Sequence, residues 1–307
     1  MPENKRFLPE GLRPPAEHTL AALREAAGQG EILEAVALRC GMDHTLHFSL
    51  GGVAGEMPRQ EAVAPWISGA SREIAVLSRV GRPTCFTVAA LRADAKGAPV
   101  ALLSRRAAQE IAMDFFLAHL EPGMVLTCRV TRLEPYGAFL DIGCGITAIL
   151  PIERISVSRI SHPADRFREG QKILAAVYAM DREKRRITMT HRELLGTWME
   201  NASRFRPGET VRGVVRSLQP YGAFIELAPN LSGLADLQEG LAPGGGVSVY
   251  IKGIRPERMK VKLQVIQLLP PPEPGPLPYQ VTDGQLDRWV YSPPGCEKVL
   301  ETVFKAP

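Results

Sequence analysis

The stretch Pro135-Tyr136-Gly137-Ala138-Phe139 occurs a second time, unchanged, as Pro220-Tyr221-Gly222-Ala223-Phe224. Its surroundings repeat as well, because a glycine lies thirteen positions and a valine six positions before each tyrosine (Gly123 and Gly208; Val130 and Val215). Internal similarity of this kind indicates one structural unit built twice. The repeated block therefore fixes the frame in which the rest of the chain is interpreted.

Residues 122–192 contain the first copy of the block and are the second of three repeats in the chain. Their sequence predicts five short strands. Alternating or β-branched residues cover 125–130, 136–142, 146–150, 172–180 and 185–190, and Gly143-Cys144-Gly145 predicts a hairpin turn. Residues 152–167 between the third and fourth strands follow no regular pattern. Five strands with one long connection after the third are typical of an OB-type barrel.

The same plan extends in both directions. The third repeat, 207–266, is shorter after its third strand, where Pro243-Gly244-Gly245-Gly246 replaces the long connection. Upstream, 30–38, 46–55, 85–91 and 100–104 have strand character and predict a degenerate first repeat with an insertion at about 62–82.

Helical spacing of apolar residues at 105–120 and 191–201 predicts linker helices, and the run Pro270–Pro278 predicts an extended spacer. Residues 279–307 are expected either to dock on a barrel or to form a small hairpin and helix. The fold class is thus mainly β, with tandem five-stranded OB-type barrels joined by helical linkers. The expected domains are an N-terminal helical arm (1–28), a divergent barrel (29–106), a linker helix (107–121), a barrel (122–192), a second linker helix (193–205), a barrel (206–268) and a Pro-rich C-terminal segment (269–307).

The charge of the chain is mildly positive, +4 over 307 residues. Residues 122–194 hold 12 Lys and Arg against 8 Asp and Glu, and residues 206–268 hold 8 against 5. The excess therefore lies in the two repeats that carry the block, which fits a phosphate-bearing partner.

The five cysteines are scattered and include no C-x-x-C pair, which argues against a disulfide framework and a structural zinc site. No apolar run reaches the roughly 20 residues of a spanning helix, and the N-terminus does not resemble a signal peptide. We therefore expect a cytoplasmic chain that does not enter a membrane.

At these residues the sequence resembles the S1 RNA-binding domain family. The resemblance lies in the Tyr136-Gly137-Ala138-Phe139 opening, the Gly turn, and an ending in which Asp181 is followed by Arg185-Arg186 and an Ile-Thr pair. It covers 122–192 almost completely and the first half of 207–265. The segment Leu50–Pro58 looks like the divergent first domains of bacterial ribosomal protein S1-like proteins.

The resemblance implies that RNA lies on strands two and three, held by two aromatic rings, a histidine and a basic residue that opens strand five. Carried over, it assigns Tyr136, Phe139 and Arg186 in the second repeat, with Asp181 near them, and Tyr221, Phe224 and Lys260 in the third. The usual histidine is absent, because Pro151 occupies that region in the second repeat and Ala235 or Asp236 in the third. His44 and His47 lie where the first repeat should carry its aromatic pair. We do not expect that repeat to bind RNA.

The residue types support this assignment physically, since aromatic rings stack on bases largely without regard to sequence. Tyr136 and Phe139 are three positions apart, so an ideal strand would point them to opposite faces, and a bulge or a twist at Gly137 is expected to bring them together. The alternative is that Phe139 and Phe224 belong to the barrel core. Candidate phosphate contacts are Arg129, Arg132, Lys184, Arg185 and Arg186, and in the third repeat Arg212, Arg216, Arg258, Lys260 and Lys262.

Other chemistry finds no support in the pattern. The glycine-rich pieces lack the P-loop context, His44 and His47 lack carboxylate or thiol companions for a metal, and no nucleophile and base stand at a suitable spacing. His162 and His191 are interpreted as exposed loop and helix-start residues. No cofactor and no catalysis are expected.

The leading hypothesis is a non-catalytic protein that binds single-stranded RNA, mRNA above all, with the small ribosomal subunit as a further partner. The alternative from another class is a protein-interaction adaptor that docks on the ribosome or an RNA-processing complex.

Overall fold

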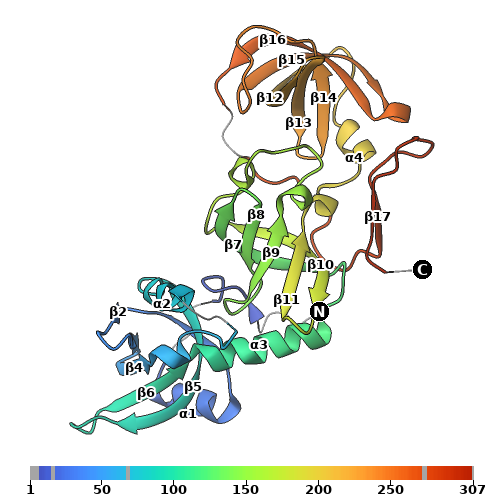
Figure 1. The fold of residues 1–307 in the computed structure, drawn as a ribbon. Helices are drawn as coiled ribbons and strands as arrows, with labels where there is room; N and C mark the ends of the chain where they lie inside the picture. Colours follow the sequence, from blue (N-terminus) through green and yellow to red (C-terminus); the bar gives the residue numbers. More distant parts are fainter. Residues whose placement is uncertain (1–6, 15–17, 67–69, 272–274, 306–307) are drawn as a thin grey trace. The chain divides into compact units, whose positions relative to one another are not determined.

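The computed structural model describes residues 7–14, 18–66, 70–271 and 275–305 (Figure 1). The chain divides into two compact units. The N-terminal unit comprises 1–120 together with 141–147, and the C-terminal unit comprises 121–140 and 148–307. The fold is mainly β, as the sequence predicts, and two of its sheets are closed barrels.

The second repeat is a closed five-stranded barrel with the strand order β10-β11-β9-β8-β7. Residues 125–129 of its first strand pair with the fourth strand. Its fifth strand runs parallel to the third, with Thr188 opposite Ile149. All five strands predicted for this repeat are confirmed: β7 (Val125–Glu134), β8 (Gly137–Asp141), β9 (Thr147–Pro151), β10 (Lys172–Asp181) and β11 (Arg186–Thr190).

The third repeat closes in the same order, β12-β13-β14-β16-β15. Its core is formed by alternate strand residues such as Val215, Ala223, Ile225, Val249 and Leu263, each no more than 1 % exposed. Period-two burial of this kind leaves the intervening side chains on the outer face. The strands are β12 (Thr210–Gln219), β13 (Gly222–Ala228), β14 (Leu231–Ala235), β15 (Gly246–Arg255) and β16 (Lys260–Leu269).

The first repeat has the same strand neighbours, but its first strand is split in two. The six strands follow the order β1-β5-β6-β4-β3-β2, and the two end strands, β1 and β2, are consecutive pieces of chain. Phe48, Phe86 and Leu103 lie in its core. Its strands are β1 (Leu33–Val36), β2 (Arg39–Cys40), β3 (Leu46–Leu50), β4 (Val53–Met57), β5 (Pro83–Ala93) and β6 (Pro99–Ser104).

Helices stand between and beside the repeats. Helix α1 (Leu20–Gln29) begins at Thr19, whose hydroxyl caps the Ala22 amide, and ends at Gly30 in the left-handed conformation. The insertion in the first repeat contains α2 (Ala70–Leu77), and α3 (Arg105–His119) fills the first predicted linker. The second linker is interrupted at Gly196, so that a 3₁₀ turn η5 (Arg192–Leu195) and a short α4 (Trp198–Ala202) replace one continuous helix.

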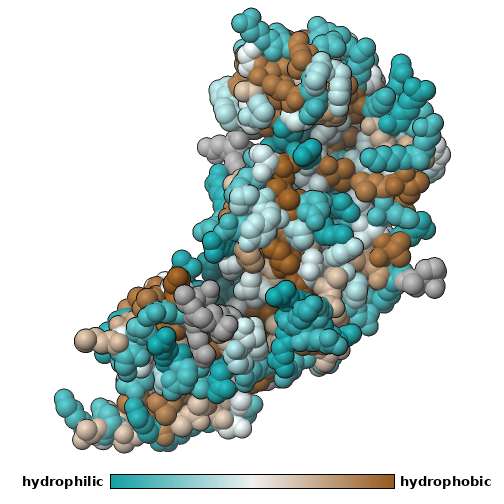
Figure 2. Space-filling view, viewed as in Figure 1, coloured by the Kyte–Doolittle hydropathy of each residue, from teal (hydrophilic) through white to brown (hydrophobic). Residues whose placement is uncertain are grey.

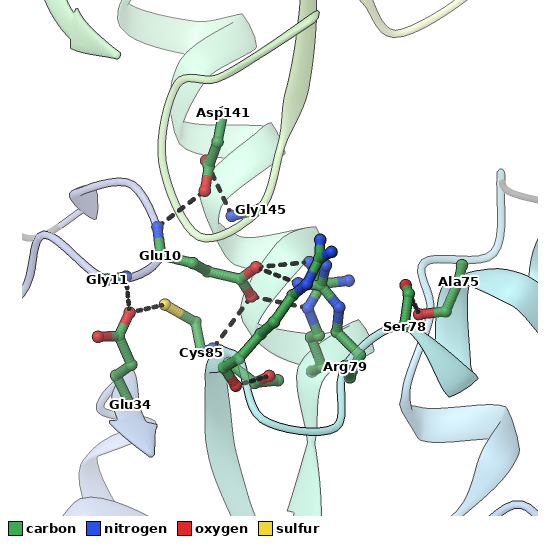
Figure 3. A network of polar contacts seen from close by, with 12 residues as sticks. Glu10, Gly11, Glu34, Ala75, Ser78, Arg79, Cys85, Asp141 and Gly145 are labelled. Atoms are coloured by element: carbon green, nitrogen blue, oxygen red, sulfur yellow. Dashed lines mark hydrogen bonds and ion pairs between the residues drawn. The ribbon is translucent and has the colours of Figure 1, made fainter. Parts of the chain in front are cut away.

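A buried network of charges joins distant parts of the N-terminal unit (Figure 3). The Glu10 carboxylate lies 2.8 Å from Arg105 Nε and 2.7 Å from Arg79 Nη1, and its backbone N–H donates to Asp141. Burial alone would raise the pKa of Glu10, but the two arginines lower it overall. Burial, reinforced by the charge of Glu10, raises the pKa of Asp141 to about 7. Buried ion pairs and a hydrogen bond thus hold the segment around Glu10 in place within the N-terminal unit.

The C-terminal segment is part of the C-terminal unit's core. Strands β17 (Arg288–Val290) and β18 (Glu301–Val303) form a small hairpin. Trp289 and Tyr291 are each 6 % exposed and belong to the same apolar cluster as the third barrel. The Tyr291 hydroxyl donates to the Asn230 carbonyl at 2.6 Å. The segment thus docks and forms a hairpin, but the helix expected with the hairpin does not occur in the described residues 279–305.

His191 is buried, which corrects the sequence interpretation of an exposed residue. Its Nδ1–H donates to the Ile155 carbonyl (2.7 Å), which leaves Nε2 to accept from the Tyr279 hydroxyl at 3.2 Å. Burial lowers its pKa to about 4. The residue ties the second barrel to the C-terminal segment.

Candidate nucleic-acid interface

The two rings of each repeated block lie on one surface. Tyr136 and Phe139 have ring centroids 6.1 Å apart at 90°, and Tyr221 and Phe224 have centroids 6.2 Å apart at 87°. Edge-to-face packing of this kind is favourable for aromatic pairs. Tyr136 and Tyr221 are 60 % and 68 % exposed, so most of each ring is open to a partner.

The alternation of the strand keeps both phenylalanines out of the barrel core. Ala138 and Leu140, on either side of Phe139, are fully buried, as are Ala223 and Ile225 around Phe224. Since successive residues of a strand point to opposite faces, the phenylalanines face outward. Both are half-buried, which disfavours the core interpretation.

No bulge occurs at the glycine of the third barrel. In the third barrel, Gly222 pairs regularly with Gln219, and the irregularity lies on the opposite strand between Val215 and Ser217. Tyr221 reaches the face of Phe224 because it belongs to the turn that precedes the strand.

The glycine of the block serves a close approach between strands. A Cβ at Gly137 would lie 2.5 Å from the Leu150 carbonyl oxygen, and one at Gly222 would lie 2.6 Å from that of Ala235. No side chain larger than hydrogen fits such a distance.

A groove of about 690 Å³ runs across the outer face of the third barrel. The strand register sets side chains in a row across it, because Phe224 pairs with Leu234 and Leu234 with Lys262. Tyr221 and Lys260 also line this groove. Three of the residues assigned to this repeat, Tyr221, Phe224 and Lys260, are therefore brought together, whereas Arg258 lies in the neighbouring turn η6 (Pro256–Arg258) and does not line it.

Four cations surround the groove, two of which the sequence analysis missed. Lys260 and Lys262 are joined by Lys252 and Arg255, and all four are exposed. Among the described residues that line the groove, Asp236 is the one carboxylate. A face with aromatic rings and an excess of positive charge offers both stacking and phosphate contacts.

Equivalent positions in the second barrel follow from the register of the last hairpin. Asp181 pairs with Arg186 as Arg255 pairs with Lys260, so Arg186 and Lys260 are counterparts. By the same count Tyr178 corresponds to Lys252, and Thr188 to Lys262. The second barrel therefore carries fewer cations around its aromatic pair than the third.

The remaining residues assigned to the second barrel shape this hairpin. Asp181 accepts the Lys184 amide at 2.9 Å, and this bond, followed by the Lys184 charge, lowers its pKa. Arg185 adopts a left-handed φ of 51°, as Met259 does with 49° in the third barrel. Each turn thus delivers a basic residue to the start of strand five. Arg154, missed by the sequence analysis, stacks its guanidinium 3.1 Å from the centroid of the Tyr178 ring.

The first repeat has other residues at the positions of Phe224, Lys260 and Lys262. The pairing register, counted from the bulge of strand four, places His47 at the position of Phe224. It places Val100 and Leu102 at the positions of Lys260 and Lys262. His44 has a left-handed φ of 62° and lies 3.4 Å from Glu73 of α2.

Some of the proposed phosphate contacts have other roles. Arg216 lies 2.8 Å from Glu226 with only 9 % of its side chain exposed. Arg132 pairs with Glu134, and Lys184 with Asp181. Arg212 lines a different cavity. The carboxylate partners of Arg216, Arg132 and Lys184 thus give these three side chains an ion-pairing role within the protein.

Metal-binding and membrane-spanning features are both missing from the described residues. No grouping of three or more His, Cys, Asp and Glu side chains suited to a metal ion occurs there. Nor does any helix in the described ranges have the length and apolar character to cross a bilayer.

The S1 RNA binding domain family matches residues 119–192. The small ribosomal subunit protein bS1 homolog of Bacillus subtilis is 36 % identical over 124 residues, covering 40 % of this chain and 32 % of its own length. The bS1 protein of Leuconostoc lactis is 31 % identical over 188 residues, covering 56 % and 44 %. The chain thus spans less than half the length of these relatives.

Among solved structures, a multidomain protein with nucleic acid binding domains from Streptococcus pneumoniae is 14 % identical over 77 % of this chain and 73 % of its own, with a TM-score of 0.26. Residues 119–192 match the S1 RNA-binding domain family, and the chain is similar to bacterial small ribosomal subunit protein bS1.

Proposed function

We propose that this chain is a non-catalytic RNA-binding protein of the cytoplasm. It holds single-stranded RNA, mRNA in particular, across the aromatic faces of the second (122–192) and third (206–268) repeats, at the small ribosomal subunit. The observation that carries the proposal is the groove of the third barrel, where Tyr221 and Phe224 stand among four exposed cations. The match of 119–192 to the S1 family and the similarity to bS1 support it.

The experiment removes one ring from each barrel, Tyr136→Ala together with Tyr221→Ala. Stacking contributes about 1–3 kcal/mol per base, so the double variant is expected to bind a labelled, unstructured RNA at least about tenfold more weakly. Fluorescence anisotropy measures the affinity, and circular dichroism checks the fold.

Two controls sharpen this test. Tyr136→Phe with Tyr221→Phe keeps both rings and is expected to keep most of the affinity. Tyr250→Ala removes a ring that is 38 % exposed and does not line the groove, and it is expected to change little. Unchanged affinity in the double alanine variant would refute the proposal.

A second candidate function, docking of a protein partner, concerns the first repeat. Its register positions lack Phe224, Lys260 and Lys262, although Arg92 pairs with Val100 as Arg255 pairs with Lys260. The N-terminal unit exposes Leu38, Ile74 and Leu77 by 61 %, 67 % and 48 %. Figure 2 shows hydrophobic residues at the surface around α2. If this repeat docks on a ribosomal protein, Ile74→Asp with Leu77→Asp will abolish cosedimentation with small subunits while RNA affinity stays the same.

A further inference from the structure

A second cavity, of about 540 Å³, lies in the C-terminal unit. It is lined by β12, β13, residues 164–166 and residues 275–278, and it shares no described lining residue with the groove that carries Tyr221 and Phe224. Two carboxylates, Asp165 and Glu226, line it together with four arginines, so its described walls hold an excess of two positive charges. These arginines are Arg166, Arg204, Arg212 and Arg216.

The inner part of the cavity is a charge cluster with too few acceptors. Glu226 accepts from both Arg166 and Arg216, with Arg216 Nε at 2.8 Å and Nη2 at 3.3 Å. Arg166 and Glu226 are each only 6 % exposed. The Nε–H of Arg166 has no hydrogen-bond partner among the described residues. One carboxylate, Glu226, is thus shared by two guanidinium groups, so this wall holds positive charge beside the cavity.

Asp165 does not correct the imbalance. Its Oδ1 lies 3.6 Å from Arg216 Nη1, while its Oδ2 accepts from the backbone and hydroxyl of Ser161 at 3.1 and 3.2 Å. It therefore serves mainly to hold its own loop.

The outer part of the cavity adds two further cations. Arg204 and Arg212 are exposed, and no ion pair of either occurs in the described part of the chain. A purely structural network of Arg166, Glu226 and Arg216 would not need them. Guanidinium groups match phosphate through paired N–H donors, and several converging on one cavity favour a ligand with more than one negative charge.

We propose that this cavity binds phosphate groups, with Arg204 and Arg212 as direct ligands and Arg166 and Arg216 as fixed positive charges behind them. The phosphates come either from the backbone of a single-stranded RNA or from a free polyphosphate-bearing molecule. The site does not depend on the aromatic faces.

The test uses the full chain and two probes, inorganic tripolyphosphate and a labelled oligouridylate. The variant is Arg204→Gln with Arg212→Gln. The matched control is Arg168→Gln with Arg206→Gln, which removes the same charge from two exposed arginines that line neither cavity. Calorimetry follows tripolyphosphate, and anisotropy at several salt concentrations follows RNA.

The expected result is tripolyphosphate binding that is at least about tenfold weaker in the cavity variant than in the control. If RNA supplies the phosphates, the slope of log affinity against log salt will also be shallower by about 1.4, since each phosphate contact in a single strand contributes about 0.7. A change in tripolyphosphate binding alone assigns the site to a free ligand.

Equal behaviour of the cavity variant and the control with both probes overturns the proposal. The Tyr136→Ala and Tyr221→Ala variant separates it from the proposed function, because that variant is expected to lose RNA and to keep tripolyphosphate. A chain that binds no RNA but binds tripolyphosphate through Arg204 and Arg212 would refute only the proposed function.

Discussion

At the scale of single residues, His191 makes the stability of the C-terminal unit depend on pH. Its pKa falls from an ordinary 6.5 to about 4 on folding, because burial disfavours the charged ring. The folded state therefore binds its proton less readily than the unfolded chain. The contribution of His191 to the free energy of unfolding is therefore complete above pH 6.5 and is lost as the pH falls toward 4.

We predict that His191→Asn flattens this pH dependence. The wild-type chain should lose up to about 3 kcal/mol between about pH 7 and pH 4 through this group, and the variant should not. Melting temperatures at several pH values measure the difference. His162→Asn, at a half-exposed histidine, should behave as the wild type, and a variant with the full wild-type slope would contradict the assignment.

Gly222 offers a second test at this scale. Its φ of 148° and the 2.6 Å distance that would separate an added Cβ from the Ala235 carbonyl oxygen leave no room for a side chain. Gly222→Ala should destabilise the third barrel by about 1–3 kcal/mol, as measured by denaturant unfolding. Gly253→Ala on β15, where a Cβ would meet no described atom within 4 Å, is the control. Equal effects of the two would count against the close approach.

At the scale of elements, the last hairpin of each barrel sets how strongly that barrel depends on charge. Exchanging Lys252→Tyr and Lys262→Thr gives the third barrel the second barrel's residues at two positions. The slope of log RNA affinity against log salt should become shallower by about 1.4. The reverse exchange, Tyr178→Lys with Thr188→Lys, should make it steeper. Slopes unaffected by both exchanges would show that these positions do not meet phosphate.

Strands and turns could be predicted because their signals are local. Alternation of apolar residues identified all five strands of the second barrel, and the repeated block located both aromatic pairs. The role of His191 could not be predicted, because its partner Tyr279 lies 88 positions away. Arg216 meets Glu226 on the neighbouring strand, but its second carboxylate, Asp165, belongs to another repeat.

The missed cations have a different explanation. Lys252 and Arg255 lie on strand four, and nothing local shows that this strand's outer face continues the surface of Phe224. Only the register through β14 and β16 brings them together. Arg154 likewise reaches Tyr178 from another part of the barrel. The aromatic residues at the centre of the site are therefore easier to predict from the sequence than the cations around them.

At the scale of the whole molecule, the C-terminal segment is expected to contribute to stability. Trp289 is 6 % exposed within the third barrel's apolar cluster, and its ring packs on Tyr291 with centroids 5.5 Å apart. Trp289→Ala should lower the free energy of unfolding by about 3–5 kcal/mol. Val299→Ala, in the same segment but 62 % exposed, should change it by less than about 0.5 kcal/mol. A small effect at Trp289 would mean that the segment does not complete the core.

This docking has a consequence for the timing of folding during synthesis. A nascent chain that has just completed β16 at Leu269 still lacks Trp289 and Tyr291, which belong to the same core. At about 5–20 residues per second, the third barrel waits roughly one to four seconds for them. During that interval the apolar surface that Trp289 and Tyr291 cover in the folded protein stays uncovered by them. Exposed apolar surface favours aggregation, so a third barrel without β17 and β18 is expected to aggregate more readily than the folded unit.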